Sequence, residues 1–412
     1  MLFFELLQVA IGNRKELTHT PTAEEWRELY ALAQRQTLVG ISFRGVELLP
    51  EAQRPPKALL MQWYMATERI KALNADLDRK ALAVANKFLE EGFASLVLKG
   101  QGISKLYILR DNDNVNENIN QSSGREKLTS ASTLGVCRTP GDIDIWLHGK
   151  RKDILSYVRR YVPDCEPVYH HVDFPVIEGL DIEVHFTPSW MNSPVTNHRL
   201  QRFFRESADA LFARNDDGEF SILNSQTVPL FIEGRAEQSE AEGVTSVARR
   251  QSYSEIPSPN LAFNRVYILV HIYRHLFGEG IGLRQLLDYY FVLHQGFTEE
   301  ERAETMRTLR SLKMQRFTAA VMWVLQEVYG MDDCYLLTTP NEREGRFLQN
   351  EIMLAGNFGH YDERIKRVAN ESALHTFVRR VARNFRFVRN YPSEVLWSPI
   401  FKLWHYFWRK II

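Results

Sequence analysis

The sequence predicts an α+β protein in which a small mixed-sheet core is flanked by N-terminal and C-terminal helical regions. Apolar residues recur at helical spacing before residue 93 and again after residue 259. Short segments that alternate polar and apolar residues, as strands do, lie between these two regions. The chain has 412 residues, which is too long for one simple core, so roughly two or three packed units are expected.

The overall composition excludes several classes of protein. The chain carries 51 basic and 51 acidic side chains, and this balance argues against a long nucleic acid as partner. The three cysteines, Cys137, Cys165 and Cys334, cannot build a disulfide framework and are expected to be free thiols. No secretory signal is evident, and no apolar run is long enough to span a membrane. We therefore expect a cytoplasmic protein.

The first predicted unit, residues 1–93, is helical. Thr20 or Thr22 can cap a helix through TAEEWRELYALAQRQ, whose first turn holds glutamates where the helix dipole favours them. A second helix follows the proline pair at 55–56, runs from Lys57 to about Glu91 and ends at a glycine. A helix of that length would extend over roughly 50 Å, so we expect a break inside it.

The second predicted unit, residues 94–232, is the mixed-sheet core. Its elements follow one another as strand, helix, strand, helix and two strands: Ser95–Leu98, 101–109, Gly141–Leu147, 150–161, Val168–Val176 and Asp181–Phe186. The dipeptide Glu178-Gly179 indicates a hairpin between the last two strands. A polar insertion at about 110–133 interrupts this unit, either as a lid over a site or as a disordered loop.

The remaining residues form a connection and a third unit. Residues 233–258 are polar and predict a linker or a long surface loop. Residues 259–412 predict a C-terminal helical domain with these helical blocks: 260–277, 281–295, 299–328, 341–357, 361–390 and 393–412. The last block carries an aromatic stripe of Trp397, Phe401, Trp404 and Trp408. Such a stripe is either domain core or a weak contact with a membrane surface or partner.

Three carboxylates form the sharpest candidate site. Asp142 and Asp144 are two apart on a predicted strand and therefore project from the same face, and Glu183 lies on a later strand. Paired carboxylates repel unless a cation lies between them, and Mg²⁺ binds through carboxylate and phosphate oxygens. A third carboxylate would complete a two-metal site for phosphoryl chemistry. The alternative is a solvated strand face. Gly141, which permits close approach of a ligand, and the apolar partners at 143, 145 and 147 favour a site.

Four segments carry a resemblance to a known family: LVLKG at 96–100, RTPGDIDIW at 138–146, GLDIEVHF at 179–186 and HIYRHLFGEGIGLRQLLDYY at 271–290. Together they resemble the bacterial group of uncharacterised nucleotidyltransferases within the DNA polymerase beta-like nucleotidyltransferase superfamily. That group combines a Leu-Lys-Gly turn, an Arg-x-x-Gly-Asp-x-Asp strand and a later Glu-x-His strand. The resemblance covers about 90–295, and the flanking helices match only in character.

The resemblance implies a reaction and its site residues. Asp142, Asp144 and Glu183 would hold two Mg²⁺ ions, and a nucleoside monophosphate would pass from an NTP such as ATP to an acceptor hydroxyl, with release of pyrophosphate. The turn at Lys99 and Gly100 would approach the phosphates. The nucleotide-binding residues would then be the following: Lys99, Gly100, Gly102, Arg138 and Gly141. The superfamily usually has Gly-Ser or Gly-Gly at this turn, where this chain has Lys-Gly-Gln-Gly. Lys99 is therefore either a phosphate-binding charge or a surface lysine, and Arg138 would bridge to phosphate or to a carboxylate.

Several further polar residues are candidates for contact with the metal ligands or the acceptor: His185, His271, His275, Arg284 and Asp288. His271 and His275 are four apart on a predicted helix, as are Arg284 and Asp288, which we expect to pair. The alternative is a buried polar network between the helical domain and the core. A zinc-peptidase helix would need Glu where Ile272 stands, so zinc hydrolysis is disfavoured.

The sequence therefore leads to two hypotheses of different classes. The first is a Mg²⁺-dependent nucleotidyltransferase whose acceptor, a small molecule or a protein side chain, is unidentified. The second is a non-catalytic nucleotide-binding or interaction protein on the same fold, because fold does not fix function.

The adjacent residues His170 and His171 flank one predicted strand, and one of them must point inward. We expect both to have a structural role.

Overall fold

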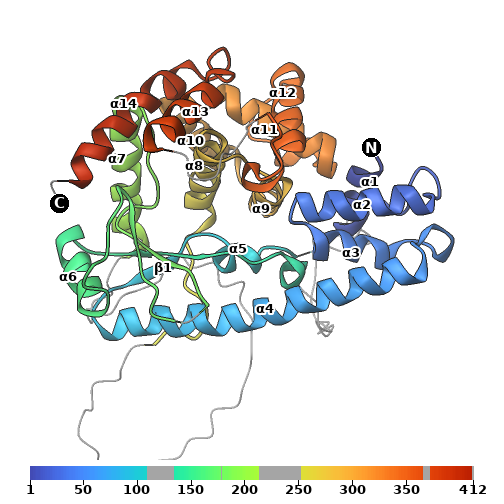
Figure 1. Cartoon of the computed structure of the whole chain (residues 1–412), viewed down its shortest axis with the longest axis horizontal. Helices are drawn as coiled ribbons and strands as arrows, with labels where there is room; N and C mark the ends of the chain where they lie inside the picture. The colour runs from blue at the N-terminus through green and yellow to red at the C-terminus, as the bar shows by residue number, and fades with distance from the viewer. Residues whose placement is uncertain (109–133, 178, 213–251, 365–371, 411–412) are drawn as a thin grey trace, which may run out of the picture.

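The computed structural model describes residues 1–108, 134–177, 179–212, 252–364 and 372–410. The predicted α+β class is confirmed, because helices surround one four-stranded mixed sheet in this part of the chain (Figure 1). The insertion at 110–133 and most of the linker at 233–258 lie outside the described residues, so the lid and the disordered loop stay alternatives. The division of the chain at residues 93, 232 and 258 also stays a prediction.

The N-terminal region consists of four α-helices and one 3₁₀ turn: α1 (Leu2–Ala10), α2 (Ala23–Arg35), α3 (Val39–Leu48), η1 (Glu51–Gln53) and α4 (Lys57–Glu90). Thr22, rather than Thr20, caps α2. Its hydroxyl accepts a hydrogen bond from the backbone N–H of Glu25, and the Glu25 carboxylate accepts one from the backbone N–H of Thr22. This reciprocal capping box satisfies two N–H groups that the first turn would otherwise leave unpaired.

Helix α4 is continuous over its 34 residues, so the predicted break is wrong. Its first half packs on the N-terminal helices, where the Trp63 ring lies 6.1 Å from Trp26 and 5.0 Å from Tyr30 between centroids. Its second half packs beneath the sheet through Phe88, whose ring lies 5.7 Å from Phe174. Because each half has its own apolar partners, the helix extends as one rod along the molecule (Figure 1).

The sheet has the strand order β1-β2-β4-β3. Its strands are β1 (Ser95–Val97), β2 (Ile143–Leu147), β3 (His171–Asp173) and β4 (Ile182–His185). β1 and β2 are antiparallel, β2 and β4 are parallel, and β3 and β4 form the predicted antiparallel pair. Helix α6 (Arg151–Tyr161) lies in the crossover from β2 to β3. All four strands are shorter than predicted, most of all β3 with three residues, and so is α5 (Gln101–Ser104) with four.

The two faces of the sheet differ in character. Ile143, Ile145, Ile182 and Val184 share a buried apolar cluster with residues of α4 and α6, such as Phe88. Alternate residues of the same strands point to the opposite face. That face carries the polar side chains of β2, β3 and β4, and the register pairs Asp144 with Glu183. The alternation predicted from the sequence therefore separates a core face from a polar face.

The described end of the predicted linker packs on the sheet. Tyr253 is buried, and its hydroxyl accepts a hydrogen bond from the backbone N–H of Ser95. The Val97 N–H donates to the carbonyl of Pro257 at 2.8 Å. Residues 252–258 thus satisfy the outer edge of β1, which would otherwise expose unpaired backbone groups.

The remaining helices are α7 (Pro194–Leu211), α8 (Leu261–Gly278), α9 (Leu283–His294), α10 (Glu299–Ser311), α11 (Gln315–Tyr329), α12 (Glu342–Ala355), α13 (Ala373–Phe385) and α14 (Pro392–Arg409), with 3₁₀ turns at Leu134–Cys137, Asp333–Tyr335 and Asn357–Gly359. Helix α7 has no counterpart among the predicted elements. The block predicted at 299–328 is two helices, because Lys313 adopts a left-handed φ of 60°. No helix in the described ranges is long and apolar enough to cross a membrane.

Replacement of Trp63 by alanine tests the coupling of α4 to the N-terminal helices. Trp63 is fully buried, and its indole N–H donates to the carbonyl of Val39 at 2.8 Å. We expect Trp63→Ala to lower the free energy of unfolding by about 3–5 kcal/mol, since it leaves a cavity and removes a buried hydrogen bond. Met65→Ala is the matched control on the same helix, because Met65 is 61% exposed. Chemical denaturation checks both, and an equal loss in the two variants would contradict this packing.

Candidate functional site

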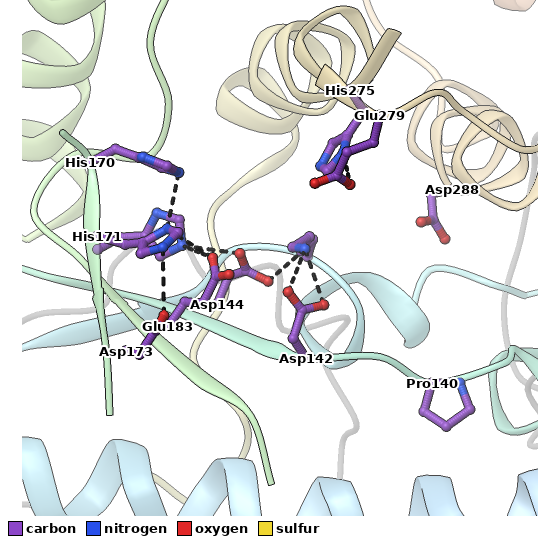
Figure 2. A network of polar contacts seen from close by, with 12 residues as sticks. Pro140, Asp142, Asp144, His170, His171, Asp173, Glu183, His275, Glu279 and Asp288 are labelled. Atoms are coloured by element: carbon purple, nitrogen blue, oxygen red, sulfur yellow. Dashed lines mark hydrogen bonds and ion pairs between the residues drawn. The ribbon is translucent and has the colours of Figure 1, made fainter. Parts of the chain in front are cut away.

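Lys99 lies between two of the three predicted carboxylates. Strand β1 leads into Lys99, Asp144 lies in β2 beside it in the sheet, and Asp142, which was expected on the strand, directly precedes β2. The Nζ of Lys99 is 3.2 Å from both carboxylate oxygens of Asp142 and 2.9 Å from Oδ2 of Asp144. Figure 2 shows the Asp142 and Asp144 carboxylates turned toward the same nitrogen. Lys99 is therefore not the surface lysine of one prediction, because its side chain is only 15% exposed.

The charges of this group stabilise one another. Burial disfavours the ammonium, but attraction to Asp144 and Asp142 outweighs it and raises the pKa of Lys99 above its usual range. Burial likewise opposes ionisation of Asp142, yet the Lys99 ammonium lowers the pKa of that carboxyl overall. Lys99 and Asp142 therefore keep their charged forms near neutral pH. The ammonium of Lys99 takes the position of a cation between the carboxylates.

His185 joins Asp144 to Glu183. Its Nε2 lies 3.0 Å from Oδ1 of Asp144 and 3.4 Å from Oε2 of Glu183. Burial alone would lower the pKa of His185, but the bonds to Asp144 and Glu183 raise it to about 9. His185 thus contacts two of the three carboxylates that were predicted as metal ligands. The parallel pairing of β2 with β4 is what brings Glu183 opposite Asp144.

Two further histidines of the site were expected to be structural. Nδ1 of His171 is 2.9 Å from Oε2 of Glu183 and 3.1 Å from Nε2 of His170. Both hydrogen-bonded histidines lower the pKa of Glu183 despite its burial. Figure 2 shows His170, His171 and Glu183 gathered beside the aspartates, whereas Asp288 lies apart from them. The sequence signal is the alternation in β3, which places His171 and Asp173 on the face that Glu183 shares.

A cleft opens beside these carboxylates. Its volume is about 590 Å³, which lies within the range of small-molecule sites. Asp142 and Glu183 lie in one wall, and Arg284 and Phe358 lie in the other: the remaining lining residues are Thr37, Thr139, Pro140, Gly141, Asp173, Phe174, Pro175, Asp181, Ile182 and Asn357. Phe358 adopts a left-handed φ of 52°, and no sequence pattern predicted its presence here.

Arg138 is engaged inside the protein. Its guanidinium donates to both carboxylate oxygens of Asp288 at 2.7 and 2.8 Å, and the Tyr107 hydroxyl donates to the same carboxylate. All three side chains are buried, and attraction to Asp288 raises the pKa of Arg138 against the effect of burial. The sequence predicted that Arg138 binds either a phosphate or a carboxylate. In the structure it binds the carboxylate of Asp288.

The predicted pairing of Arg284 with Asp288 is wrong, because Asp288 is already bound by Arg138. Arg284 instead donates to the carbonyls of Thr139 and Pro140 at 2.8 and 3.3 Å. These contacts join helix α9 to the segment that enters β2. The alternative reading of Arg284 and Asp288, a buried polar network between helical domain and core, is therefore confirmed.

His271 and His275 lie on α8 above the site and near its rim. Their rings are 4.4 Å apart, and burial lowers the pKa of His271 well below its usual range. His271 lines a small cavity together with Lys99 and Asp142. His275 is 3.6 Å from the carboxylate of Glu279 instead. His271 thus remains a candidate for ligand contact, whereas His275 points to the rim.

The three predicted glycines have different local roles. Gly100 adopts a left-handed φ of 57°, which favours glycine in the turn after Lys99. A Cβ on Gly102 would lie 2.1 Å from the carbonyl oxygen of Val97, so this glycine allows α5 to pack against β1. A Cβ on Gly141 would lie 3.7 Å from Arg284, an ordinary contact, and Gly141 lines the cleft.

The donor atoms of the site suit a hard divalent cation. Oδ2 of Asp144 is buried and accepts no hydrogen bond, although Lys99 lies beside it as an ion pair. In the described part of the chain, three overlapping groups hold ligand atoms close enough for one ion: Asp144, Glu183 and His185; His171, Asp173 and Glu183; and His170, His171 and His185. Asp142 does not belong to any of these groups. It is linked to Asp144 through the Lys99 ammonium, which contacts both carboxylates. Carboxylate oxygens are the ligands that Mg²⁺ prefers, so the residues fit it.

A family comparison bears on the general class of the protein. Residues 22–109 and 232–330 match the model of a family described as uncharacterised nucleotidyltransferase. The match supports a nucleotidyltransferase family and, at that coarse level, an enzyme. It includes Lys99, Arg284 and Asp288, whereas Asp142 and Glu183 lie between the two matched segments. Comparison with curated proteins and with solved structures found no match.

Replacement of Asp288 by alanine tests the buried pair behind the site. Removing this carboxylate leaves the Arg138 guanidinium buried without a counter-charge, so we expect a loss of about 3–5 kcal/mol in the free energy of unfolding. The matched control is Asp76→Ala on α4, which breaks an exposed ion pair with Arg79 and should leave the unfolding midpoint nearly unchanged. Denaturant unfolding of both variants measures the difference. A stable Asp288→Ala protein would show that Arg138 needs no partner there.

Proposed function

We propose that this protein is a Mg²⁺-dependent nucleotidyltransferase, which transfers a nucleoside monophosphate from an NTP to an acceptor hydroxyl and releases pyrophosphate. One observation carries the proposal: Asp142 and Glu183 line one cleft, and the buried Asp144 is joined to Asp142 through the Lys99 ammonium and to Glu183 through His185. The family match supports the general reaction class. Asp142, Asp144 and Glu183 would hold Mg²⁺, which when bound would neutralise phosphate oxygens and favour an ionised acceptor hydroxyl.

The side chains around the carboxylates have supporting tasks in this proposal. His185 and His171 orient Asp144 and Glu183 through hydrogen bonds, so the carboxylates keep one arrangement in the absence of ligand. Lys99 would exchange its contact with a carboxylate for one with a phosphate oxygen, as a mobile point charge can. Arg138, which binds Asp288, and Arg284, which donates to the carbonyl of Thr139, position the backbone before β2, and Arg284 also lines the cleft.

The cleft sets limits on the substrates. Its volume is about 590 Å³, which is sufficient for one nucleotide and leaves the acceptor at its opening. The balanced charge of the chain disfavours a long nucleic acid as acceptor. A small molecule or a protein side chain is the acceptor that we propose, in a protein that works in the cytoplasm.

A second candidate function rests on Lys99 itself. Because its ammonium already neutralises Asp142 and Asp144, the cleft would bind a nucleotide without a metal ion if Lys99 kept this position. The protein would then be a nucleotide-binding or interaction protein on the same fold. The two functions differ in one property, which is whether nucleotide binding depends on Mg²⁺.

Thermal unfolding with ATP, CTP, GTP and UTP, each with and without Mg²⁺, tests the proposal. A ligand at about 100 times its dissociation constant stabilises the folded state by roughly 2.7 kcal/mol. We expect one nucleotide to raise the unfolding temperature only with Mg²⁺, and Asp142→Asn to abolish this increase. Asp209→Asn, at an exposed position of α7, is the matched control and should behave as wild type.

The outcomes separate the two functions. Stabilisation that is equal with and without Mg²⁺, and that survives in Asp142→Asn, would favour the metal-free binding protein. No stabilisation by any of the nucleotides would contradict a donor site in this cleft.

A further inference from the structure

The solvent-facing side of helix α14 is apolar, which is unusual for a surface helix. Seven large apolar side chains of this helix are exposed: Leu396, Trp397, Ile400, Leu403, Trp404, Tyr406 and Phe407. A helix on the surface of a globular protein normally turns polar residues to water. Leu396, Ile400, Leu403 and Phe407 recur every three or four residues and so form one continuous stripe.

The opposite side of α14 is already packed on the protein. Phe401, Trp404 and Trp408 make ring contacts with Tyr169, at centroid distances of 5.8, 5.9 and 6.4 Å. Near its start, the buried Glu394 accepts a hydrogen bond from the backbone N–H of Asn192. The predicted aromatic stripe is therefore only partly buried, because Trp404 and Trp397 stay 46% and 38% exposed. The exposed stripe is a different face, and it has no partner among the described residues.

The region around this stripe is strongly basic. Residues 372–410 contain eight Lys or Arg and one acidic residue, although the charges of the whole chain balance. The acidic residue is Glu394, which is buried. Exposed positive charges are found on both helices, at Arg380 and Arg389 on or after α13 and at Arg409 and Lys410 at the end of α14. α13 and α14 lie together at one end of the molecule (Figure 1).

A basic pocket lies along one flank of the exposed stripe. It has a volume of about 590 Å³, and its lining includes Arg159, Lys402, Tyr406, Arg409 and Lys410. Glu166 also lines this pocket and pairs with Arg409. Tyr406 and Lys410, which line this pocket, are neighbours of Phe407 of the stripe along α14.

Lys402 is a positive charge of this pocket that an anion would stabilise. Its Nζ is buried and makes no hydrogen bond in the described part of the chain. Burial, together with the nearby Arg380, lowers the pKa of Lys402 to about 8. A buried ammonium without an acceptor is unfavourable, and an anionic oxygen in the pocket would remove that cost.

We propose that α14 lies in the plane of an anionic lipid membrane. Its stripe of Leu396, Ile400, Leu403 and Phe407 would enter the boundary between headgroups and acyl chains, and the basic pocket would receive a lipid phosphate. Trp397, Trp404 and Tyr406 flank the stripe with side chains that favour this boundary. Basic residues close to the surface add electrostatic attraction to anionic lipids.

The apolar stripe and the basic pocket together favour an anionic membrane as the partner of this surface. An anionic bilayer offers apolar chains and phosphate groups at one surface, which matches the stripe and the pocket together. Stable peripheral binding generally needs two such signals, and this surface supplies both. The proposal is independent of the reaction at the carboxylate site.

Vesicle flotation of the full chain tests this proposal. We expect the wild-type protein to float with vesicles of phosphatidylcholine and phosphatidylglycerol, to bind vesicles of phosphatidylcholine alone much more weakly, and to be released by added salt. The double variant Leu403→Glu/Phe407→Glu places charges on the stripe and should lose roughly tenfold or more in affinity. Both side chains are 55% exposed, so the fold should be kept, as circular dichroism will show.

Two further variants serve as matched controls. Met61→Glu/Met65→Glu replaces side chains that are 60% and 61% exposed on α4, and it should bind vesicles as wild type does. Arg409→Gln/Lys410→Gln should lose most of the preference for phosphatidylglycerol.

The proposal is overturned if wild-type protein stays unbound with anionic vesicles, or if Leu403→Glu/Phe407→Glu binds them as well as wild type. It is also overturned if light scattering shows a wild-type dimer that this variant converts to a monomer, without vesicle binding by either. The stripe would then be an interface between two copies of the chain.

Discussion

The ion pairs of Lys99 with Asp142 and Asp144 are the interaction on which the site depends. Asp142 and the buried Asp144 are two residues apart, so their carboxylates would repel, and the Lys99 ammonium lies within 3.2 Å of both and lowers the pKa of Asp142. This requires β1 to lie beside β2, because β1 leads into the lysine, β2 carries Asp144, and Asp142 directly precedes β2. The order of the strands in the sheet therefore determines which charged side chains come together at the site.

The helical regions keep this arrangement in place from outside the sheet. Helix α9 holds the segment before β2 through Asp288, which binds Arg138, and through Arg284, which binds the carbonyls of Thr139 and Pro140. Helix α8 covers the site with His271. Because these contacts are buried, a shift of the helices would move the aspartates. The C-terminal helices therefore act as a rigid support for the carboxylates as well as a surface of their own.

Much of the fold and part of the site could be predicted from the sequence. Helical spacing and strand alternation identified the long helix, the strands and the polar face that carries Asp144 and Glu183. Pairwise geometry could not be predicted, because it depends on which elements become neighbours. Arg138 rather than Arg284 pairs with Asp288, and His171 reaches Glu183, only after the chain has folded. The continuity of α4 likewise depends on tertiary packing, which local patterns do not contain.

The effect of Mg²⁺ on the stability of Lys99→Met is the most direct test of the central claim, that Lys99 holds the position of a cation between carboxylates. Without the ammonium, Asp142 and Asp144 repel, so the variant should unfold at a lower temperature than wild type in the absence of divalent ions. We predict that Mg²⁺ alone restores much of this loss and stabilises wild type far less. Monovalent salt of equal ionic strength is the control for screening. A Lys99→Met protein that Mg²⁺ leaves unchanged would contradict the claim.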